Sequence, residues 1–225
     1  MLSIIVPCLN EADGIGDALA ALAPLRTRGS EVIVVDGGSS DGTVGRSAPL
    51  ADCVLSAPRG RALQMNAGAA RARGEILLFL HADTRLPDSA DALIVESLKR
   101  SRRGWGRFDV AISGSNPLLR VVARLMNIRS RLTGIATGDQ AIFVTRSLFT
   151  AAGGYPDIAL MEDIALSKQL KRFGPPLCLR HRLIASGRRW EKHGVVRTIL
   201  LMWRLRLAYW LGADPGKLAV RYDRD

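Results

Sequence analysis

The hydrophobic positions in the first hundred residues follow two alternating spacings. Short, mostly apolar runs at residues 2–7, 31–35 and 75–80, with a briefer one around 53–55, predict buried strands. Between these runs, apolar residues recur every three or four positions, which predicts helices at 13–25, 61–73 and 88–102 and a short helix after residue 42. This alternation predicts an α/β fold with a mostly parallel central sheet and helices on both faces.

The second half of the chain has a less regular pattern. Residues 106–112 and 140–145 alternate in hydrophobicity like strands, whereas 116–132, 162–173 and 195–211 have helical periodicity. No linker rich in Gly, Pro and Ser separates the halves, and 225 residues are enough for one large core. We therefore expect a single Rossmann-like domain followed by C-terminal helices.

Polar clusters stand directly after three of the predicted strands, where an α/β sheet binds its ligands. They are Asn10 and Glu11, residues 36–43 (Asp-Gly-Gly-Ser-Ser-Asp-Gly-Thr), and His81-Ala82-Asp83. An acidic side chain such as Asp36 can accept hydrogen bonds from a ribose or a base, and glycines let the backbone approach a ligand closely. Residues 36–43 are equally compatible with a turn in which Ser40 or Asp41 caps the next helix.

The charge balance narrows the classes of partner. A net charge of +11, from 32 basic and 21 acidic residues, attracts polyanions such as nucleotide diphosphates, nucleic acid or anionic lipids. Aromatic residues make up only 5% and do not alternate with the basic ones, so no nucleic acid partner is expected. Cys8, Cys53 and Cys178 lack metal-site spacing, which indicates buried thiols in a reducing compartment. With no signal peptide and no apolar run of about 20 residues, we expect a cytoplasmic protein.

Several blocks together resemble the family 2 glycosyltransferases. The blocks are residues 3–7 with Asn10 and Glu11, then 34–43, then 61–68, and then Gly74 with the strand into His81-Ala82-Asp83, and the likeness covers roughly residues 2–190. The resemblance implies a GT-A fold, a nucleotide diphosphate sugar as donor, a divalent ion, and inversion at the anomeric carbon. It also implies a domain at 1–190, with a donor-binding half at about 1–105 and an acceptor half at about 106–190. Residues 191–225 would then form a helical extension packed on it.

The resemblance assigns residues to the sugar donor and to a metal ion. The expected donor-binding residues are Pro7, Asn10, Glu11, Asp36, Arg61, Asn66, Asp83, Arg188 and Arg189. The family's D-x-D metal motif is here His81-Ala82-Asp83, so Asp83 would hold Mg²⁺ or Mn²⁺ against the diphosphate. For His81 a role as an additional metal ligand, a hydrogen bond to the ribose and a purely structural role remain open. Arg188 or Arg189 could neutralise the leaving diphosphate, as could Arg59 and Arg61 nearer the front of the chain. The alternative for each is an exposed, solvated arginine.

The resemblance also assigns an acceptor side. Met161-Glu162-Asp163 is similar to the family's acidic motif, which makes Asp163 the base that removes the acceptor proton and Glu162 its support. The alternative is that both carboxylates only complement the positive end of a helix dipole. The residues expected to line the acceptor pocket are Gly138, Asp139, Gln140 and Trp190.

The end of the matched region departs from the processive members of the family. Residues 186–190 are similar to their Q-x-x-R-W motif, but Ser186 replaces the Gln, so processive polymerisation is not expected. The stretch Arg-Arg-Trp-Glu-Lys-His-Gly that begins at Arg188 is similar to the end of small stand-alone members associated with radical SAM and selenodomain proteins.

Residues 195–211 leave two interpretations open. Their helix would either pack on the domain or on another subunit of a homo-oligomer, or lie on an anionic membrane with Trp203, Tyr209 and Trp210 at headgroup level. The second interpretation would make the protein peripheral at the inner face of the membrane and bring the site to a lipid-linked acceptor. Three arginines, at 197, 204 and 206, exclude a spanning helix.

The sequence therefore predicts an inverting, metal-dependent glycosyltransferase. Two other functions stay open: a nucleotidyltransferase, which would release pyrophosphate, and a non-catalytic module that binds nucleotide sugars without turnover. The sugar, the base of the nucleotide and the acceptor are not encoded in a recognisable motif.

Overall fold

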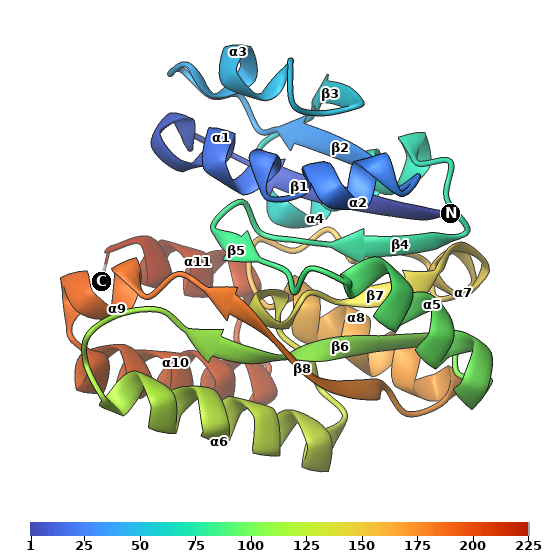
Figure 1. Cartoon of the computed structure of the whole chain (residues 1–225). Helices are drawn as coiled ribbons and strands as arrows, with labels where there is room; N and C mark the ends of the chain where they lie inside the picture. The colour runs from blue at the N-terminus through green and yellow to red at the C-terminus, as the bar shows by residue number, and fades with distance from the viewer. Residues whose placement is uncertain (225) are drawn as a thin grey trace.

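The fold is built around one eight-stranded sheet, with strands from both halves of the chain. The computed structural model describes residues 1–224 and places eight strands in the order β3-β2-β1-β4-β7-β6-β8-β5 (Figure 1). The strands are β1 (Leu2–Cys8), β2 (Glu31–Asp36), β3 (Cys53–Ser56), β4 (Ile76–Phe79), β5 (Thr84–Arg85), β6 (Trp105–Ile112), β7 (Phe143–Thr145) and β8 (Leu177–Ala185). Strands β3, β2, β1 and β4 are mutually parallel, β6 is parallel to β8, and only β7 and β5 run against their neighbours. The predicted α/β class with a mostly parallel sheet is confirmed.

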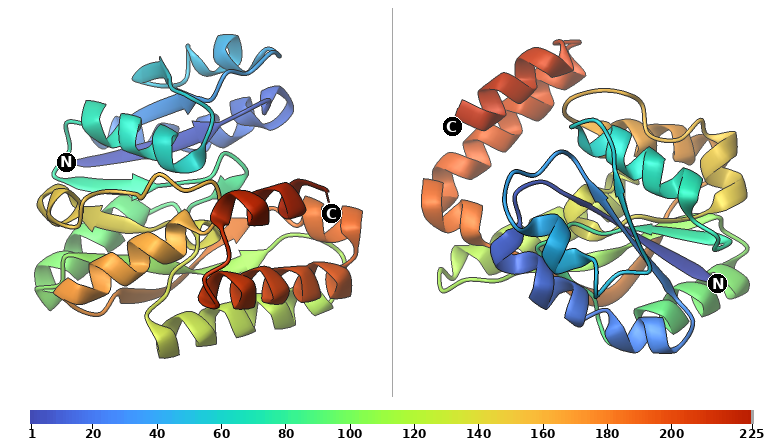
Figure 2. Two further views of the ribbon diagram at one scale, coloured as in Figure 1. Left: turned by 180° about the vertical axis from the view of Figure 1, so that it is seen from behind. Right: turned by 90° about the horizontal axis from the view of Figure 1, so that it is seen from above.

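Helices surround the sheet at both faces and at one end. They are α1 (Ala12–Ala20), α2 (Ala23–Thr27), α3 (Thr43–Ser47), α4 (Arg61–Arg71), α5 (Ala90–Ser101), α6 (Leu118–Thr133), α7 (Arg146–Ala151), α8 (Glu162–Leu170), α9 (Arg188–His193), α10 (Val195–Trp210) and α11 (Pro215–Arg224), with short 3-10 turns η1 (Gly138–Gln140) and η2 (Lys171–Phe173). Helices α1 and α5 share one core cluster with alternate residues of β1, such as Ile4 and Val6, whereas α4 and α8 share the other with Ile5 (Figure 2). All seven residues of β1 are therefore buried, which is why its apolar run is unbroken.

Helix α4 is fixed closely against the carboxyl ends of β1 and β2. A side chain on Gly68 would place its Cβ only 2.4 Å from Cγ2 of Ile5, so the helix can approach the sheet only with glycine there. The Gln64 amide Nε2 donates to the carbonyls of Cys8 and Val35, both at 2.8 Å. These contacts hold the start of α4, including Arg61, beside the strand ends.

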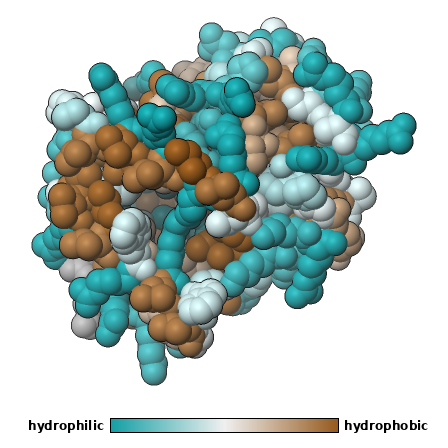
Figure 3. All heavy atoms as spheres, turned by 90° about the horizontal axis from the view of Figure 1, so that it is seen from below, coloured by the Kyte–Doolittle hydropathy of each residue, from teal (hydrophilic) through white to brown (hydrophobic). Residues whose placement is uncertain are grey.

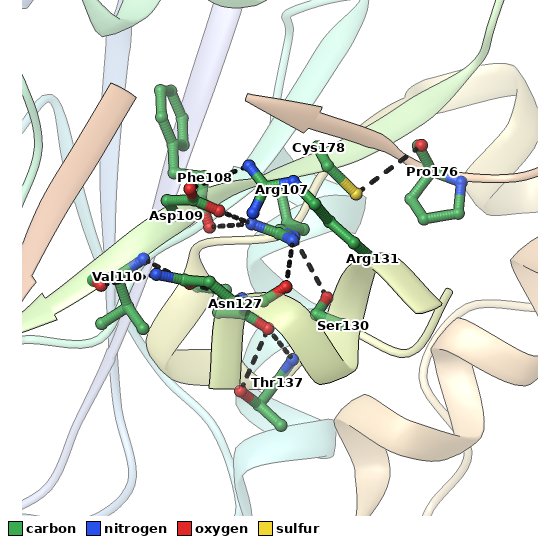
Figure 4. Close-up of polar contacts among 11 residues, drawn as sticks. Arg107, Phe108, Asp109, Val110, Asn127, Ser130, Arg131, Thr137, Pro176 and Cys178 are labelled. Atoms are coloured by element: carbon green, nitrogen blue, oxygen red, sulfur yellow. Dashed lines mark hydrogen bonds and ion pairs between the residues drawn. The ribbon is translucent and has the colours of Figure 1, made fainter. Parts of the chain in front are cut away.

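A buried polar network fixes α6 to β6 (Figure 4). Arg107, which is 0% exposed, donates to both the Asp109 carboxylate and the Ser130 hydroxyl, and Arg131 donates to the second Asp109 oxygen at 2.8 Å. The Asn127 amide exchanges two hydrogen bonds of 2.9 Å with the backbone of Val110. Each charge is paired, so α6 has one register on the sheet.

Several predicted boundaries were wrong, each for a local reason. The helix expected at 13–25 is two helices, because Pro24, in the first turn of α2, cannot continue α1. The strand expected at 140–145 begins at Phe143, because Thr137 and Gln140 form a capping box around η1. The helix expected at 162–173 ends at Leu170 and continues as η2.

Strands β5 and β8 and helices α7 and α9 were missed, whereas α11 lies within 191–225, where C-terminal helices were expected. The middle of β8 is exposed and basic, which masks its strand pattern. Its partner β5 follows the first-half strand β4, so β5 and β8 join the two halves of the chain within the sheet.

The C-terminal helices pack on α6 and on the start of α8 (Figure 2). Leu205 of α10 and Leu218 of α11 form a core cluster with Leu160, Met161 and Ile164, and Val195 forms another with α6. Over the described residues, no helix combines the length and apolar character needed to cross a bilayer.

Candidate active site

A cavity of about 790 Å³ opens at the carboxyl ends of β1, β4, β6 and β8. This is the edge at which α/β sheets bind ligands. Nine of the residues considered for the donor, the metal or the acceptor line it: Pro7, Glu11, Arg59, Arg61, His81, Asp83, Asp139, Arg189 and Trp190. They come from segments between residues 7 and 190, so the fold gathers them from both halves of the chain.

Glu11, which lines the cavity, forms an ion pair with Arg188 of α9. Nη2 of Arg188 lies 3.5 Å from Oε2 of Glu11, across from α9 to the loop after β1. Burial raises the pKa of Glu11, the Arg188 charge opposes that shift, and the Asp83 charge adds to it. A diphosphate would meet mixed charge here, with the Arg61 and Arg189 side chains available as positive groups.

The side chains of three expected donor-binding residues are engaged in hydrogen bonds within the protein, and these residues do not line the cavity. The Asp36 carboxylate accepts from the backbone N–H groups of Gly38 and Ser39, at 2.9 and 3.0 Å, and so closes the glycine-rich turn. Asn10 accepts from the backbone N–H of Ser40 at 2.9 Å. The Asn66 amide exchanges two hydrogen bonds with the backbone of Tyr155.

His81 is held by the η1 turn. Its Nδ1 lies 3.5 Å from Oδ1 of Asp139, and the other edge of the ring lies against Gly138, where an added Cβ would come within 2.4 Å of Cε1 and Nε2. Both sides of the imidazole therefore face η1. Gln140, expected to line an acceptor pocket, is instead fully buried and bonds to Thr137 and Asn127.

Asp83 is the side chain best placed to hold a divalent ion. It is exposed at the cavity, and among the described residues its carboxylate accepts one hydrogen bond, of 3.5 Å, from the Thr84 hydroxyl. Within the described part of the chain, no group of three or more His, Cys, Asp and Glu side chains could enclose an ion. This arrangement fits Mg²⁺ or Mn²⁺, which commonly take one or two carboxylates and complete their shell with phosphate oxygens and water.

Glu162 and Asp163 form an acidic pair at the start of α8. Glu162 is buried, and burial together with the Asp163 charge raises its pKa to about 6. Burial also raises the pKa of Asp163, although the backbone N–H groups of Gly138 and Ile164 donate to its two oxygens at 2.9 and 2.7 Å. Carboxyl groups whose pKa is raised toward 7 are suited to proton transfer near neutral pH.

This acidic pair faces a second cavity of about 610 Å³. Residues of α6 and α10 form much of its wall, and most of the lining side chains there are apolar. Arg61, His81, Asp139, Trp190 and Tyr222 line both cavities, so the two spaces adjoin at these side chains. The arrangement can hold one ligand on the sheet edge and a second ligand beside the carboxylates.

Sequence reasoning missed the contribution of the C-terminal helices. Thr198 and Met202 of α10 and Ala219 and Tyr222 of α11 line the first cavity. The Arg189 guanidinium stacks 3.6 Å from the centre of the Tyr222 ring and donates to the Tyr222 carbonyl at 2.6 Å. No spacing signal connects residues 33 positions apart, so this contact could be found only in the fold.

The chain matches a known family and known proteins. Residues 3–146 match the family described as Glycosyl transferase family 2. The poly-beta-1,6-N-acetyl-D-glucosamine synthase of Staphylococcus epidermidis is 26% identical over 195 residues, covering 76% of this chain and 46% of that protein. The chain therefore spans less than half the length of this curated relative.

Two solved structures share the fold. The mannosyltransferase PcManGT from Pyrobaculum calidifontis, in complex with GDP-Man and Mn²⁺, gives a TM-score of 0.65 at 24% identity, covering 92% of this chain and 60% of that one. The S. aureus TarS fragment 1-349, in complex with UDP-GlcNAc, gives a TM-score of 0.65 at 17% identity, covering 82% and 58%. These likenesses show the GT-A fold.

Proposed function

The chain belongs to glycosyl transferase family 2, and we propose that it transfers a sugar from a nucleotide diphosphate donor to an acceptor hydroxyl with inversion. One observation carries the proposal: the cavity with Asp83 and the arginines adjoins the cavity with the acidic pair. A donor bound in the first would present its sugar to an acceptor bound in the second. The mannosyltransferase and TarS complexes, which hold GDP-Man and UDP-GlcNAc, support a nucleotide sugar as the donor.

In the proposed reaction, Asp163 removes the proton of the acceptor hydroxyl. The hydroxyl oxygen attacks the anomeric carbon of the donor sugar as the bond from that carbon to the diphosphate breaks. The hydrogen bonds from Gly138 and Ile164 fix the orientation of this carboxylate. Arg61 and Arg189 lie where positive charge would stabilise the departing nucleoside diphosphate. A divalent ion held by Asp83 would neutralise further charge on the diphosphate.

The Cys8 thiol does not compete with this single displacement as a nucleophile. Cys8 lines the first cavity, but burial raises its pKa to about 12, so the sulfur stays protonated near neutral pH.

The donor assignment is tested by binding. We expect nucleotide sugars with Mg²⁺ or Mn²⁺ to raise the melting temperature of the wild-type protein, because a ligand that binds only the folded state stabilises it. Asp83→Ala should abolish the metal-dependent part of this shift, and Asp88→Ala, an exposed neighbour outside the cavity, should leave it unchanged. Equal metal-dependent binding by Asp83→Ala would refute the metal assignment.

The base is tested by turnover. Asp163→Asn should keep donor affinity and lose about 10²- to 10⁴-fold in rate, because it removes the proton acceptor while conserving shape. Release of pyrophosphate by the wild type would instead identify a nucleotidyltransferase. Tight donor binding with neither transfer nor hydrolysis would identify a binding module.

We also propose that α6 and α10 contact an anionic membrane surface. Both helices expose apolar residues at helical spacing, and these gather on the face shown in Figure 3. The exposed rows are Leu118, Val121, Leu125, Ile128 and Leu132 on α6, and Val196, Leu200, Trp203, Leu207 and Trp210 on α10. The two helices contain seven arginines and no Asp or Glu. A second copy of the chain on this face would oppose arginine to arginine, whereas anionic lipid complements the charge.

Sedimentation with anionic vesicles tests the contact. We expect a bound fraction at low salt that falls at high salt, and loss of binding in the double variant Trp203→Glu, Trp210→Glu, whose positions are 66% and 75% exposed. No bound fraction at low salt, or a concentration-dependent dimer that the double variant disrupts, would contradict the proposal.

A further inference from the structure

Two nitrogens of an arginine in the cavity between α6 and α10 have no hydrogen-bond partner among the described residues. Nε and Nη2 of Arg129 are both buried, and neither bonds to any described residue. A buried donor left unpaired costs free energy, so such groups ordinarily have a partner. Nε and Nη2 together form the side of the guanidinium that binds a carboxylate or phosphate with two parallel hydrogen bonds.

Arg129 lies between a charged end and an apolar end of this cavity. Burial lowers the pKa of Arg129, and the nearby negative charges of Asp163 and Asp139 oppose that shift. Away from these carboxylates, the wall consists of aliphatic and aromatic side chains from both helices, including Val122, Leu125, Ile199 and Trp203. Several of these side chains are exposed at the mouth of the cavity, for example Leu125 at 55% and Trp203 at 66%.

We propose that this cavity binds the acceptor, and that the acceptor is an amphiphile with an apolar chain between α6 and α10 and a phosphate group on Arg129. The inference rests on the proposed glycosyl transfer and adds the chemical class of its acceptor. A hydroxyl close to that phosphate would lie at the Glu162–Asp163 end of the cavity, where its proton can be removed. The apolar mouth opens beside the exposed rows of α6 and α10, so the amphiphile could enter directly from a lipid surface.

Binding of three small probes separates the parts of the proposal. The probes are dodecyl phosphate below its micelle concentration, dodecanol and inorganic phosphate, followed by tryptophan fluorescence because Trp190 and Trp203 line the cavity. We expect dodecyl phosphate to bind saturably and at least about tenfold more tightly than either other probe, since only it engages both ends of the site. Equal affinity for inorganic phosphate and dodecyl phosphate would refute the apolar part.

Matched variants locate the site. Arg129→Gln should weaken dodecyl phosphate by about 10- to 100-fold and leave dodecanol unchanged, because only the charged hydrogen bonds are lost. Leu125→Asp should weaken both alkyl probes, whereas Leu118→Asp, on the same helix, 46% exposed and outside the cavity lining, should weaken neither. Wild-type affinity in both Arg129→Gln and Leu125→Asp would overturn the proposal.

The probe-binding result can be interpreted separately from the binding of the nucleotide-sugar donor. Nucleotide-sugar binding is measured on the same variants and should be retained in Leu125→Asp. If the wild type binds dodecyl phosphate as described but no nucleotide sugar, the proposed function fails while this cavity assignment stands. If it binds nucleotide sugars but not dodecyl phosphate, only the acceptor class is wrong.

Discussion

Replacing Glu162 with glutamine should stabilise the protein at neutral pH. Burial and the Asp163 charge raise the pKa of Glu162 from its ordinary value of 4.5 to about 6. The folded protein therefore holds this proton more tightly than the unfolded chain does. That contribution to stability is complete below about pH 4.5 and is lost as the pH rises through about 6.

Above pH 6 the ionised Glu162 destabilises the folded protein, and the size of this effect follows from the pKa difference. Raising the pKa from 4.5 to about 6 corresponds to about 2 kcal/mol of unfavourable free energy for the ionised, folded state. Arg61 lies 4.0 Å from Glu162, and its attraction is already contained in the pKa. Glutamine is neutral at every pH, so Glu162→Gln avoids this cost.

Thermal or urea unfolding at two pH values measures the effect. At about pH 7.5, the free energy of unfolding of Glu162→Gln should be about 2 kcal/mol larger than that of the wild type. For a chain of this size, this corresponds to a melting temperature about 4–8 °C higher. At about pH 4 the two proteins should differ little, because Glu162 is then protonated in both states. Glu96→Gln, on the exposed side of α5, controls for the substitution itself. A variant that is less stable at pH 7.5, or equally stabilised at both pH values, would refute the reasoning.

Three further predictions concern packing and the site. Asp109→Ala should cost about 3–5 kcal/mol in urea unfolding, because it leaves the fully buried Arg107 without its carboxylate; a cost below about 1 kcal/mol would mean that the network does not depend on this pair. Gly68→Ala should cost about 1–3 kcal/mol, because its Cβ would lie 2.4 Å from Ile5, whereas Gly14→Ala, with no atom within 4 Å, should be neutral or slightly stabilising in the same assay. Gly138→Ala should displace His81 from Asp139 and disturb the hydrogen bond from the Gly138 N–H to Asp163, and so reduce turnover; wild-type kcat in this variant would show that this geometry is not required.

Part of the fold was determined by local pattern alone. Strands β1, β2 and β4 are buried on both faces, so nearly every position in them is apolar and the strand is visible without knowledge of its neighbours. The polar segments after them followed from the same argument, because parallel strands end at one edge of the sheet. For this reason Glu11 and Asp83 could be named before their meeting in one cavity was known, whereas Asp139, which precedes β7, was named from the family resemblance.

The tertiary structure decided the partner of each side chain. Asn66 resembled a donor-binding residue, yet its amide bonds to Tyr155, which is 89 positions away in the sequence. Arg129 carried no signal within its helix, and only the packing of α6 against α10 buries its guanidinium in a cavity. Hydrophobic periodicity records which face of an element is buried, because that depends on each residue's own contact with water. It does not record which distant residue completes a hydrogen bond or closes a cavity, because those contacts exist only once the elements have packed.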